Sequence, residues 1–477
     1  MNRRSVDVAV IGAGSAGLPA RRAARAAGAS CVLIDSGPLG TTCARVGCMP
    51  SKLLIAAADA AHAVRSGEVF GLRTTLTVDG GAVLERVQRE RDRFVGFVLR
   101  SLEAVRQEGD LIEGTARLIG PHTLRVDDHT ELEARSIVVA TGSAPVVPPP
   151  FRGLGDRLLS NETLFELSEL PRSVLVAGAG VIGLELGQAL QRLGTRVTLV
   201  SIDDAVGPLA DPRCRAAALQ AFGAEYELFL NYRLEQLERQ GERVEVRFRD
   251  SAGTPHLRTV DRVLMAAGRQ PRLAGLGLEH AGVQLERGQV RDWDPATTRI
   301  GQTHVFLAGD VSAYRPLLHE AADEGQIAGL NAARYPAVAA EPRRTPLAIV
   351  FSEPQLAIVG ASFRTLDGER HRIGEVDYGD QGRARVMHQN RGLARLYGEV
   401  GTELLVGAEM VGPRVEHTAH LLAWAIQQRL TVPQLLQLPF YHPVIEEGIR
   451  TALRSLKTAL ASPRSPDTDC REFRPGS

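Results

Sequence analysis

Two cysteines and a lysine carry the most chemistry in this sequence of 477 residues. Cys43 and Cys48 are five residues apart, and Lys52 follows shortly after the second. An apolar, alanine-rich run begins at Leu53, so the segment predicts a loop that continues into a helix, with both cysteines in its first turns. A helix N-terminus and a nearby ammonium group both favour thiolate over thiol. The spacing predicts two sulfurs that can come within bonding distance of each other.

Zinc binding and two unreactive thiols are the alternatives for this pair. Zinc usually takes four ligands, and neither a CxxC pair nor a histidine cluster accompanies the cysteines, so the sequence favours redox chemistry and predicts no metal. Lys52 and Lys457 are the only lysines in a chain that otherwise uses arginine. A compact ammonium, whose pKa can change, supports a role for Lys52 beside the sulfurs.

Length, charge and hydropathy limit the classes of protein that fit. A chain of this length suggests two to four domains. Basic and acidic residues balance at 56 each, which leaves no basic field for nucleic acid. No apolar run approaches the roughly 20 residues of a membrane span. The first strand pattern begins at Val6 and leaves no room for a signal peptide, so we expect a cytoplasmic protein, in which a disulfide is more often catalytic than structural.

The N-terminal segment has the full context of a dinucleotide-binding fingerprint. An apolar strand pattern, 6–11, runs into a glycine-rich turn and a helix, and a second strand pattern, 30–34, ends in Asp35. The glycines let the backbone approach a pyrophosphate at the helix N-terminus, and Asp35 can accept a hydrogen bond from a ribose hydroxyl. The turn residues that we expect to bind this nucleotide are Gly12, Gly14, Ser15 and Gly17.

The same pattern returns later in the chain and predicts a second dinucleotide site. Strand patterns 173–177 and 196–200 flank a turn and a helix, and the glycines of this turn are Gly178, Gly180 and Gly183. Ser201 stands where an acid would mark NAD. No base for a 2′-phosphate follows it closely, and Asp203 and Asp204 would repel one. The sequence therefore favours NAD without excluding NADP.

Short motifs and a change of composition complete the organisation. Three further apolar strand patterns end in glycine-containing pairs, which are Thr141-Gly142, Gly268-Arg269 and Gly309-Asp310. A proline cluster, 145–150, is typical of a domain boundary. Residues 345–460 show strand and helix patterns without a glycine fingerprint, which predicts a separate α+β unit. We expect the tail from Ser462, which contains Cys470, to be disordered.

Together these motifs resemble the pyridine nucleotide–disulfide oxidoreductases of the glutathione reductase type, and among them the dihydrolipoamide dehydrogenases most. The resemblance runs from about Val6 to Leu460 and rests on six motifs in the same order. They are 12–17 with Asp35, 42–52, 140–142, 178–185, 309–310, and His442-Pro443 with Glu447.

The resemblance implies an α/β protein with two Rossmann-like dinucleotide-binding domains, for FAD and NAD(P), and a C-terminal α+β dimerisation domain. The expected boundaries are 1–147 and 268–340 for the FAD domain, 148–267 for the NAD(P) domain, 341–461 for the dimerisation domain and 462–477 for the tail.

By the same resemblance, Cys48 faces the flavin as the charge-transfer sulfur and Cys43 exchanges with the substrate. Lys52 is then expected near flavin N5, paired with Glu185. The residues implied to hold FAD are the first fingerprint with Asp35, Thr42, Lys52, Thr141, Gly142, Gly309 and Asp310. The residues implied to hold the nicotinamide nucleotide are the second fingerprint with Ser201, Asp203, Gly268 and Arg269.

His442 matches the acid–base histidine of the family, and Glu447 matches the residue that orients it. Thiol–disulfide exchange needs a base for the attacking thiol and an acid for the leaving thiolate, and histidine can be both near neutral pH. In the family this histidine comes from the partner subunit, which implies a homodimer with shared sites. The resemblance further implies cis peptide bonds at His442-Pro443 and Glu353-Pro354, and an interface core of Leu421, Leu422 and Trp424.

The implied reaction passes electrons between a dithiol, the Cys43–Cys48 disulfide, FAD and NAD(P). Dihydrolipoamide, free or on a lipoyl carrier domain, is the favoured substrate. Thr41, Tyr441 and Val444 depart from the family pattern near the redox residues, and they affect the choice of disulfide more than the mechanism. The alternatives are an NADPH-dependent reductase of a low-molecular-weight disulfide, and a reductase of metal ions or quinones in stress defence. We expect neither a nucleic acid nor a membrane partner.

Overall fold

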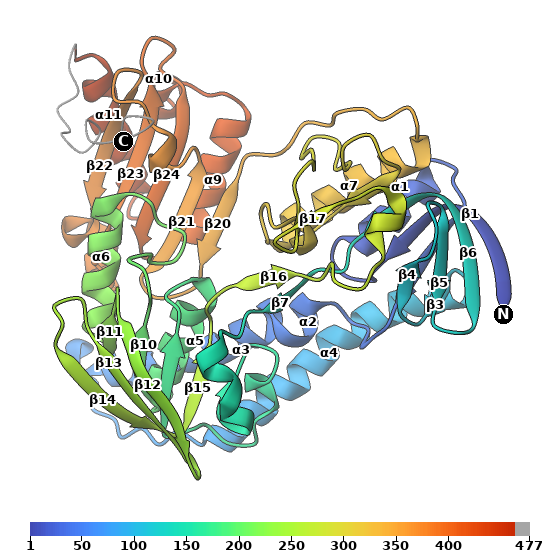
Figure 1. Ribbon diagram of the computed structural model, residues 1–477. Helices are drawn as coiled ribbons and strands as arrows, with labels where there is room; N and C mark the ends of the chain where they lie inside the picture. The colour runs from blue at the N-terminus through green and yellow to red at the C-terminus, as the bar shows by residue number, and fades with distance from the viewer. Residues whose placement is uncertain (463–477) are drawn as a thin grey trace.

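Three β-sheets with their helices form three neighbouring lobes (Figure 1). This computed structural model describes residues 1–462, so Cys470 lies outside the described residues. In Figure 1 the first sheet lies at the right, the second at the lower left and the third at the upper left. Two of the sheets are built mainly from parallel strands and the third is antiparallel, which confirms the predicted α/β class with a C-terminal α+β unit.

The first sheet has the strand order β3-β2-β1-β6-β5-β4, with β19 added beside β6. Strands β1, β2, β3, β6 and β19 run parallel, whereas β4 and β5 form an antiparallel meander on β6. The bounds are β1 Asn2–Ile11, β2 Cys31–Asp35, β3 Leu111–Glu113, β4 Ala116–Leu118, β5 Thr123–Val126, β6 Thr130–Val139 and β19 Val305–Leu307.

Both faces of this sheet are buried, which explains its continuous apolar strand patterns. Val8 and Val10 of β1 pack into one core cluster, and the residues that alternate with them pack into another. Helices α1 (Gly17–Ala26) and α7 (Leu318–Arg334) cover the face of Val8. The two helices lie very close. A Cβ on Gly325 of α7 would come within 2.1 Å of the carbonyl oxygen of Ala16, just before α1, and a Cβ on Gly329 within 2.0 Å of that of Ala20 in α1.

The second sheet repeats this plan with five parallel strands in the order β11-β10-β9-β15-β8. Helix α5 (Val181–Arg192) connects β9 to β10, and α6 (Pro212–Gly223) connects β10 to β11. A three-stranded antiparallel sheet, β12-β13-β14, precedes β15 in the chain. The bounds are β8 Leu158–Leu159, β9 Ser173–Ala177, β10 Arg196–Val200, β11 Glu227–Phe229, β12 Arg233–Gln240, β13 Arg243–Arg249, β14 Pro255–Val260 and β15 Arg262–Met265.

Two connections join the first lobe to the second. A ribbon of two antiparallel strands, β7 (Ser143–Pro145) and β16 (Arg269–Pro271), carries the chain across and back. Helix α3 (Cys48–Arg65) packs against α5 of the second lobe, and the long helix α4 (Gly80–Gln107) packs along α3. Since α3 begins at Cys48, the cysteine segment lies where the first two lobes meet.

The third sheet is antiparallel, in the order β20-β21-β24-β23-β22. Helix α9 packs on β21 and β24, and α11 packs on β22 and β23. The bounds are β20 Leu347–Val350, β21 Gln355–Gly360, β22 His371–Asp377, β23 Leu393–Glu399, β24 Leu405–Gly412, α8 Gly382–Val386, α9 Val415–Gln427, α10 Val432–Leu436 and α11 Glu446–Leu460.

One residue expected at a subunit interface lies elsewhere. Leu422 of α9 is buried in the core of the third lobe itself, so its assignment to an interface is wrong. The helical period turns Leu422 inward and leaves Leu421 and Trp424 outward, with 47% and 64% of their surface exposed. Those two residues stay predicted interface residues.

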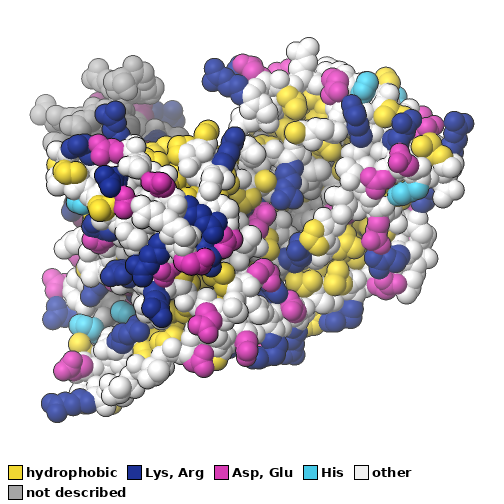
Figure 2. Space-filling view, turned by 60° about the horizontal axis from the view of Figure 1, so that its bottom comes forward, with side chains coloured by type: hydrophobic (Ala, Val, Ile, Leu, Met, Phe, Trp, Pro, Cys, Tyr) yellow, Lys and Arg dark blue, Asp and Glu magenta, His cyan; other side chains and the backbone are white. Residues whose placement is uncertain are grey.

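The surface shows no field of a single charge on the face turned forward in Figure 2, where basic and acidic side chains are interspersed. This pattern accords with a net charge of zero. Each helix within residues 1–462 is too short or too polar to cross a lipid bilayer.

Candidate active site

The two cysteines lie on separate helices, so the expectation of one helix with both in its first turns is wrong. The short helix α2 (Thr42–Val46) contains Cys43, and α3 begins at Cys48. Gly47 between them has φ −125° and ψ −118°, which is outside helical geometry. A Cβ on Gly47 would lie 3.0 Å from the carbonyl oxygen of Thr42, so a glycine lets the chain turn tightly between the helices.

The two thiols interact and differ in acidity. A hydrogen bond from the Cys43 thiol and the charge of Lys52 outweigh burial and lower the pKa of Cys48 to about 7. The same hydrogen bond, together with burial, raises the pKa of Cys43. Cys48 is also the first residue of α3, where the helix dipole favours a negative charge. In the reduced pair, Cys48 is therefore the thiolate and Cys43 the thiol.

Lys52 is held by a carboxylate from the second lobe. Its Nζ donates to both oxygens of Glu185, at 3.0 and 2.8 Å. Glu185 is buried on α5, and its Oε1 also accepts a hydrogen bond from the backbone N–H of Phe351 at 2.9 Å. The ring centroid of Phe351 is 4.7 Å from Lys52 Nζ, within the range of a cation–π contact. The predicted pairing of Lys52 with Glu185 is confirmed, and it joins residues of all three lobes close to Cys48.

A cavity of 320 Å³ opens at the carboxyl ends of the first-sheet strands. The predicted flavin-binding residues that line it are Gly12, Gly14, Ser15, Asp35, Thr42, Thr141, Gly142, Gly309 and Asp310. Gly17 and Lys52 are not among its lining residues. Arg45, Thr115 and Arg272 line it too. Sequence reasoning missed Thr115 and Arg272 because they lie outside the motifs, and it missed Arg45 because it considered only the cysteines, Thr42 and Lys52 of the 42–52 motif.

Two glycines of the first fingerprint are required by close packing, and a third leaves room for a ligand. A Cβ on Gly17 would lie 1.7 Å from the carbonyl oxygen of Gly12, and a Cβ on Gly12, whose φ is +111°, would lie 2.3 Å from that of Ala140. By contrast, a Cβ on Gly14 would meet no atom within 4 Å. This open space at the start of α1 fits the pyrophosphate of a dinucleotide.

Acidic side chains stand on two sides of the same cavity. Asp35 Oδ2 accepts a hydrogen bond from the backbone N–H of Ala13 at 2.6 Å, and Oδ1 accepts one from Gly37 at 2.7 Å. A carboxylate has about four acceptor positions, so Asp35 can still bind a ribose hydroxyl. Asp310 follows β19 and its Oδ2 accepts a hydrogen bond from Ser143 Oγ at 2.9 Å. These acceptors fit the hydroxyl groups of FAD.

A hydrogen-bonded path that sequence reasoning missed leads from Asp310 to the cysteine segment. Arg269 Nε donates to Ser143 Oγ at 2.8 Å, and Arg269 Nη1 donates to Asn161 Oδ1 at 3.1 Å. Asn161 Nδ2 donates to the carbonyl oxygen of Val46, the last residue of α2, at 2.8 Å. Asn161 therefore fixes the end of α2 just before the turn at Gly47. No local pattern marks Asn161, because the contact depends on the pairing of β7 with β16.

The second fingerprint repeats the geometry of the first. A Cβ on Gly183 would lie 1.9 Å from the carbonyl oxygen of Gly178, and a Cβ on Gly178, whose φ is +120°, would lie 2.3 Å from that of Ala266. A Cβ on Gly180 would meet no atom within 4 Å. At the end of β10, Ser201 is buried and its Oγ donates to Asp203 Oδ1 at 2.9 Å. These residues lie together at the carboxyl ends of β9 and β10.

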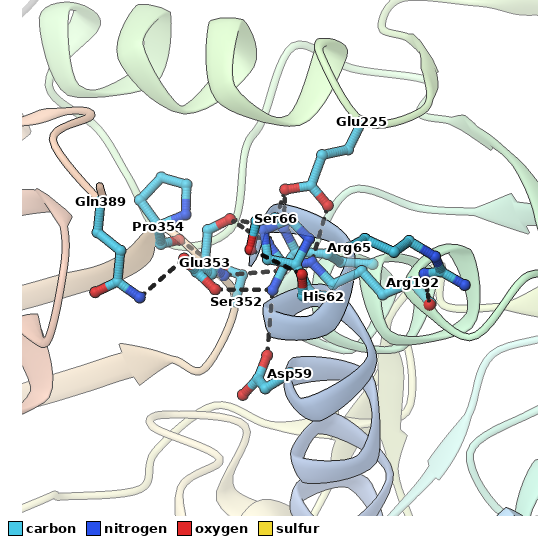
Figure 3. Close-up of polar contacts among 11 residues, drawn as sticks. Asp59, His62, Arg65, Ser66, Arg192, Glu225, Ser352, Glu353, Pro354 and Gln389 are labelled. Atoms are coloured by element: carbon cyan, nitrogen blue, oxygen red, sulfur yellow. Dashed lines mark hydrogen bonds and ion pairs between the residues drawn. The ribbon is translucent and has the colours of Figure 1, made fainter. Parts of the chain in front are cut away.

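A cluster of ionic contacts fixes α3 against the other two lobes (Figure 3). Arg192, at the end of α5, is buried and binds Glu225 through Nε and Nη2, at 2.9 and 2.8 Å. Its Nη1 donates to Glu353 at 2.9 Å and to Asp59 of α3 at 3.2 Å. Arg65 of α3 donates to the carbonyl oxygen of Arg192. The helix that begins at Cys48 is therefore anchored along its length, which keeps Cys48 in place.

His442 and Glu447 form the predicted pair. His442 Nδ1 is 3.1 Å from both carboxylate oxygens of Glu447, and Glu447 Oε2 also accepts a hydrogen bond from the backbone N–H of Val444 at 3.2 Å. Hydrogen bonding to His442 lowers the pKa of Glu447. The imidazole is 81% exposed, so Nε2 faces outward. The predicted cis bonds at His442-Pro443 and Glu353-Pro354 are confirmed.

The remaining described cysteines are sealed in the core. Cys31 lies in β2 and Cys214 in α6, and burial is the main cause that raises the pKa of both thiols. Within residues 1–462 no group of three or more His, Cys, Asp or Glu side chains is placed to hold a metal ion. The reactive sulfur of the described chain is therefore confined to Cys43 and Cys48.

Comparison with known proteins agrees with this arrangement. Residues 6–325 match the pyridine nucleotide-disulphide oxidoreductase family, and residues 347–453 match the dimerisation domain of that family. The chain is 30% identical to dihydrolipoyl dehydrogenase 3 of Pseudomonas aeruginosa, with 94% of this chain and 97% of that one covered. It is 28% identical to a mercuric reductase of Staphylococcus aureus, with 94% and 81% covered. The crystal structure of LpdA from Mycobacterium tuberculosis is similar with a TM-score of 0.81 at 27% identity, and 95% and 99% of the two chains are covered.

Proposed function

This chain belongs to the pyridine nucleotide-disulphide oxidoreductase family, and we propose on that premise that it exchanges electron pairs between a dithiol or disulfide substrate and NAD. The family consists of flavoprotein disulfide reductases that bind FAD and a pyridine nucleotide, and its dimerisation domain implies a homodimer. The observation that carries the proposal is the placement of Cys48 at the start of α3, beside Cys43 and the Lys52–Glu185 pair.

The residues of the first cavity would hold FAD. The open space at Gly14 would receive the pyrophosphate, and Asp35 and Asp310 would accept hydrogen bonds from hydroxyl groups. FAD, when bound there, supplies the two-electron chemistry that connects the sulfur pair with the nicotinamide. The Lys52 ammonium keeps a positive charge next to Cys48 and stabilises its thiolate.

The substrate step is thiol–disulfide exchange at Cys43. One substrate thiol loses its proton to His442 and attacks Cys43 Sγ, so that a mixed disulfide forms and Cys48 leaves as a thiolate. The second substrate thiol then closes the substrate disulfide and releases Cys43, which takes a proton from His442. Two electrons have moved from the dithiol to the protein pair, and one proton remains for His442 or solvent.

His442 acts in this step from the partner subunit. Its exposed imidazole is available to a second copy of the chain, and Glu447 holds Nδ1 so that Nε2 exchanges the proton. Each active site would then combine the cysteines of one subunit with the histidine of the other.

Dihydrolipoamide, free or on a carrier domain, is the substrate we favour, since the most similar curated relatives include dihydrolipoyl dehydrogenases. A reductase of metal ions or quinones is the second candidate. It is favoured by the likeness to a mercuric reductase and by Tyr441, which precedes His442 in the chain and is 80% exposed.

Absorbance spectroscopy of the purified holoenzyme tests the proposal. Reduction by dihydrolipoamide should produce a long-wavelength absorbance from the Cys48 thiolate beside the flavin, and Cys48→Ser should abolish it. Rates with lipoamide, glutathione-type disulfides, quinones and metal ions identify the substrate. Quinone or metal-ion reduction that survives His442→Ala, without turnover of lipoamide, would favour the second candidate. A purified protein that retains no flavin would contradict both.

A further inference from the structure

The two fingerprints differ at the position where an acid is expected. Asp35 follows Gly12 by 23 residues, and Ser201 follows Gly178 by the same 23 residues. Ser201 therefore occupies the place of Asp35 in the second unit, and its hydroxyl has no charge with which to recognise a ribose. The nearest carboxylate in the chain is that of Asp203, two residues later.

We propose that Asp203 replaces the missing acid, accepts hydrogen bonds from the adenosine ribose of NAD and excludes the 2′-phosphate of NADP. This inference rests on the proposed function, because it names the selecting residue of the same nucleotide site. Ser201 is a positioning residue in this arrangement, since it acts through the carboxylate that it holds.

The hydrogen bonds around Asp203 fix one carboxylate oxygen and leave the other available. Ser201 Oγ donates to Oδ1 at 2.9 Å, and the backbone N–H of Ala205 donates to the same oxygen at 3.2 Å. The carbonyl oxygen of Asp203 accepts a hydrogen bond from the N–H of Asn231 at 3.1 Å. From the described residues Oδ2 receives no hydrogen bond, whereas Asp35 uses both oxygens on backbone groups.

The loop that carries Asp203 is tied back to the fingerprint. The N–H of Gly207 donates to the carbonyl oxygen of Ala179, which lies between the first two glycines of the turn, at 2.8 Å. Residues 201–207 therefore form a closed loop beside the open space at Gly180. This closure keeps the Asp203 carboxylate on the side of the sheet where the adenosine half of a dinucleotide binds.

Two of the basic groups nearby pair with other carboxylates, and a third, Arg364, lies close enough to Asp204 to help lower the pKa of that carboxyl. Arg215 of α6 pairs with Asp204 at 2.5 Å and also donates to its carbonyl oxygen. Arg213 pairs with Glu375 of the third lobe at 2.8 Å. A 2′-phosphate at the ribose would meet the Asp203 carboxylate, and two negative charges placed side by side repel.

Titration of the holoenzyme with NADH and NADPH, and with AMP and 2′,5′-ADP as fragments, tests the proposal. Asp203→Asn keeps an oxygen for Ser201 and removes the charge, so we expect NADH binding to weaken about tenfold while NADPH binding tightens. Ser201→Ala should weaken NADH binding by a smaller factor. Glu238→Gln, which removes one exposed charge from β12 of the same lobe, is the matched control and should change neither affinity.

Two outcomes would overturn the inference. One is a wild-type protein that binds NADPH more tightly than NADH, and the other is an Asp203→Asn variant with an unchanged ratio of the two affinities. Both readouts are independent of disulfide chemistry. If Asp203→Asn changes the ratio of the two affinities but the protein reduces no disulfide, the proposed function is wrong and this inference holds. If the protein reduces disulfides but Asp203→Asn leaves the ratio unchanged, this inference is wrong and the proposed function holds.

Discussion

The first and second fingerprints share the packing of their glycines and differ at the end of the strand that follows, where Asp35 stands in one and Ser201 in the other. In each, the last glycine packs its Cα against the carbonyl oxygen of the first, and the middle glycine faces open space. At the strand end they diverge, because Asp35 accepts a hydrogen bond from Ala13 of its own fingerprint, whereas Ser201 donates one to Asp203. The comparison teaches that the turn is dictated by steric packing, while recognition of the nucleotide depends on a position that packing leaves free.

The largest expected effect comes from matched substitutions of the last glycine. Gly17→Ala and Gly183→Ala each place a Cβ within 1.9 Å of a backbone carbonyl oxygen, so the helix must move away from its strand. We expect Gly17→Ala to lose flavin, and Gly183→Ala to keep flavin and lose NADH binding by at least about a hundredfold. Flavin absorbance and NADH titration distinguish the two.

Gly223→Ala, at the end of α6, is the control for these variants, because its Cβ would meet no atom within 4 Å. It should retain both ligands. Loss of both ligands in Gly183→Ala would show that the two units do not fold independently enough for the comparison to hold.

The next largest effect tests the place where the two units meet. Asn161→Leu leaves the Val46 carbonyl and the Arg269 guanidinium each without the hydrogen bond to Asn161. This loss should cost about 1–3 kcal/mol of unfolding free energy. We expect faster alkylation of Cys43 in the reduced protein, since α2 loses its fixed end. Chemical denaturation and mass-spectrometric alkylation measure the two effects, and Asn390→Leu, which removes a hydrogen bond to Gly379 in the third lobe, is the control.

A smaller effect concerns the charge beside Cys48. The pKa of about 7 means that Cys48 of the reduced enzyme loses its negative charge as pH falls through 7. Lys52→Met removes a cause that lowers this pKa, so the midpoint should move up by about one unit, which is tenfold in thiolate fraction at low pH. The pH dependence of alkylation reports it. Lys457→Met, which changes the other lysine, should leave the midpoint where it was.

The smallest effect concerns the pH dependence of stability, which should differ between a histidine of the first unit and one of the second. Burial, followed by the neighbouring His122, lowers the pKa of His304, which precedes β19 in the first unit. The unfolded chain therefore binds more protons than the folded one below about pH 6.5. Stability that is present above that pH is lost as pH falls, by at most about 1.4 kcal/mol for each pH unit. His304→Gln should flatten the slope of melting temperature against pH between 7 and 5.5. Scanning calorimetry at several pH values measures this slope.

His256 of the second unit supplies the contrast, because a carboxylate faces its ring, with Nε2 at 2.9 Å from Asp250 Oδ2. His256→Gln should not flatten the slope. An equal effect of both histidine variants would remove this distinction between the units.

Much of this arrangement was predictable because it is written in local patterns. Both fingerprints and the cysteine pair follow from motifs with fixed spacing, whereas the Lys52–Glu185 and His442–Glu447 pairs were implied by the resemblance to the family. The division of the cysteine helix at Gly47 was missed although two signals mark it, since glycine often ends a helix and Pro50 suits the first turn of the next one. Asn161 and Arg192 were missed for another reason. The contacts of Asn161 with Val46, and of Arg192 with Asp59 and Glu353, span more than a hundred residues, and only the packed lobes bring these groups together.

The strand order of the first sheet bears on how the chain matures on the ribosome. Strand β19 pairs with β6, yet it is made only after every strand of the second sheet has been synthesised. The second unit can thus close while the first still leaves residues 137–139 of β6 unpaired on one side, beyond the part that β5 covers, and such an edge can associate with other chains. A nonsense mutation between the codons for β15 and β19 would leave a completed second lobe attached to a first sheet that lacks its last strand.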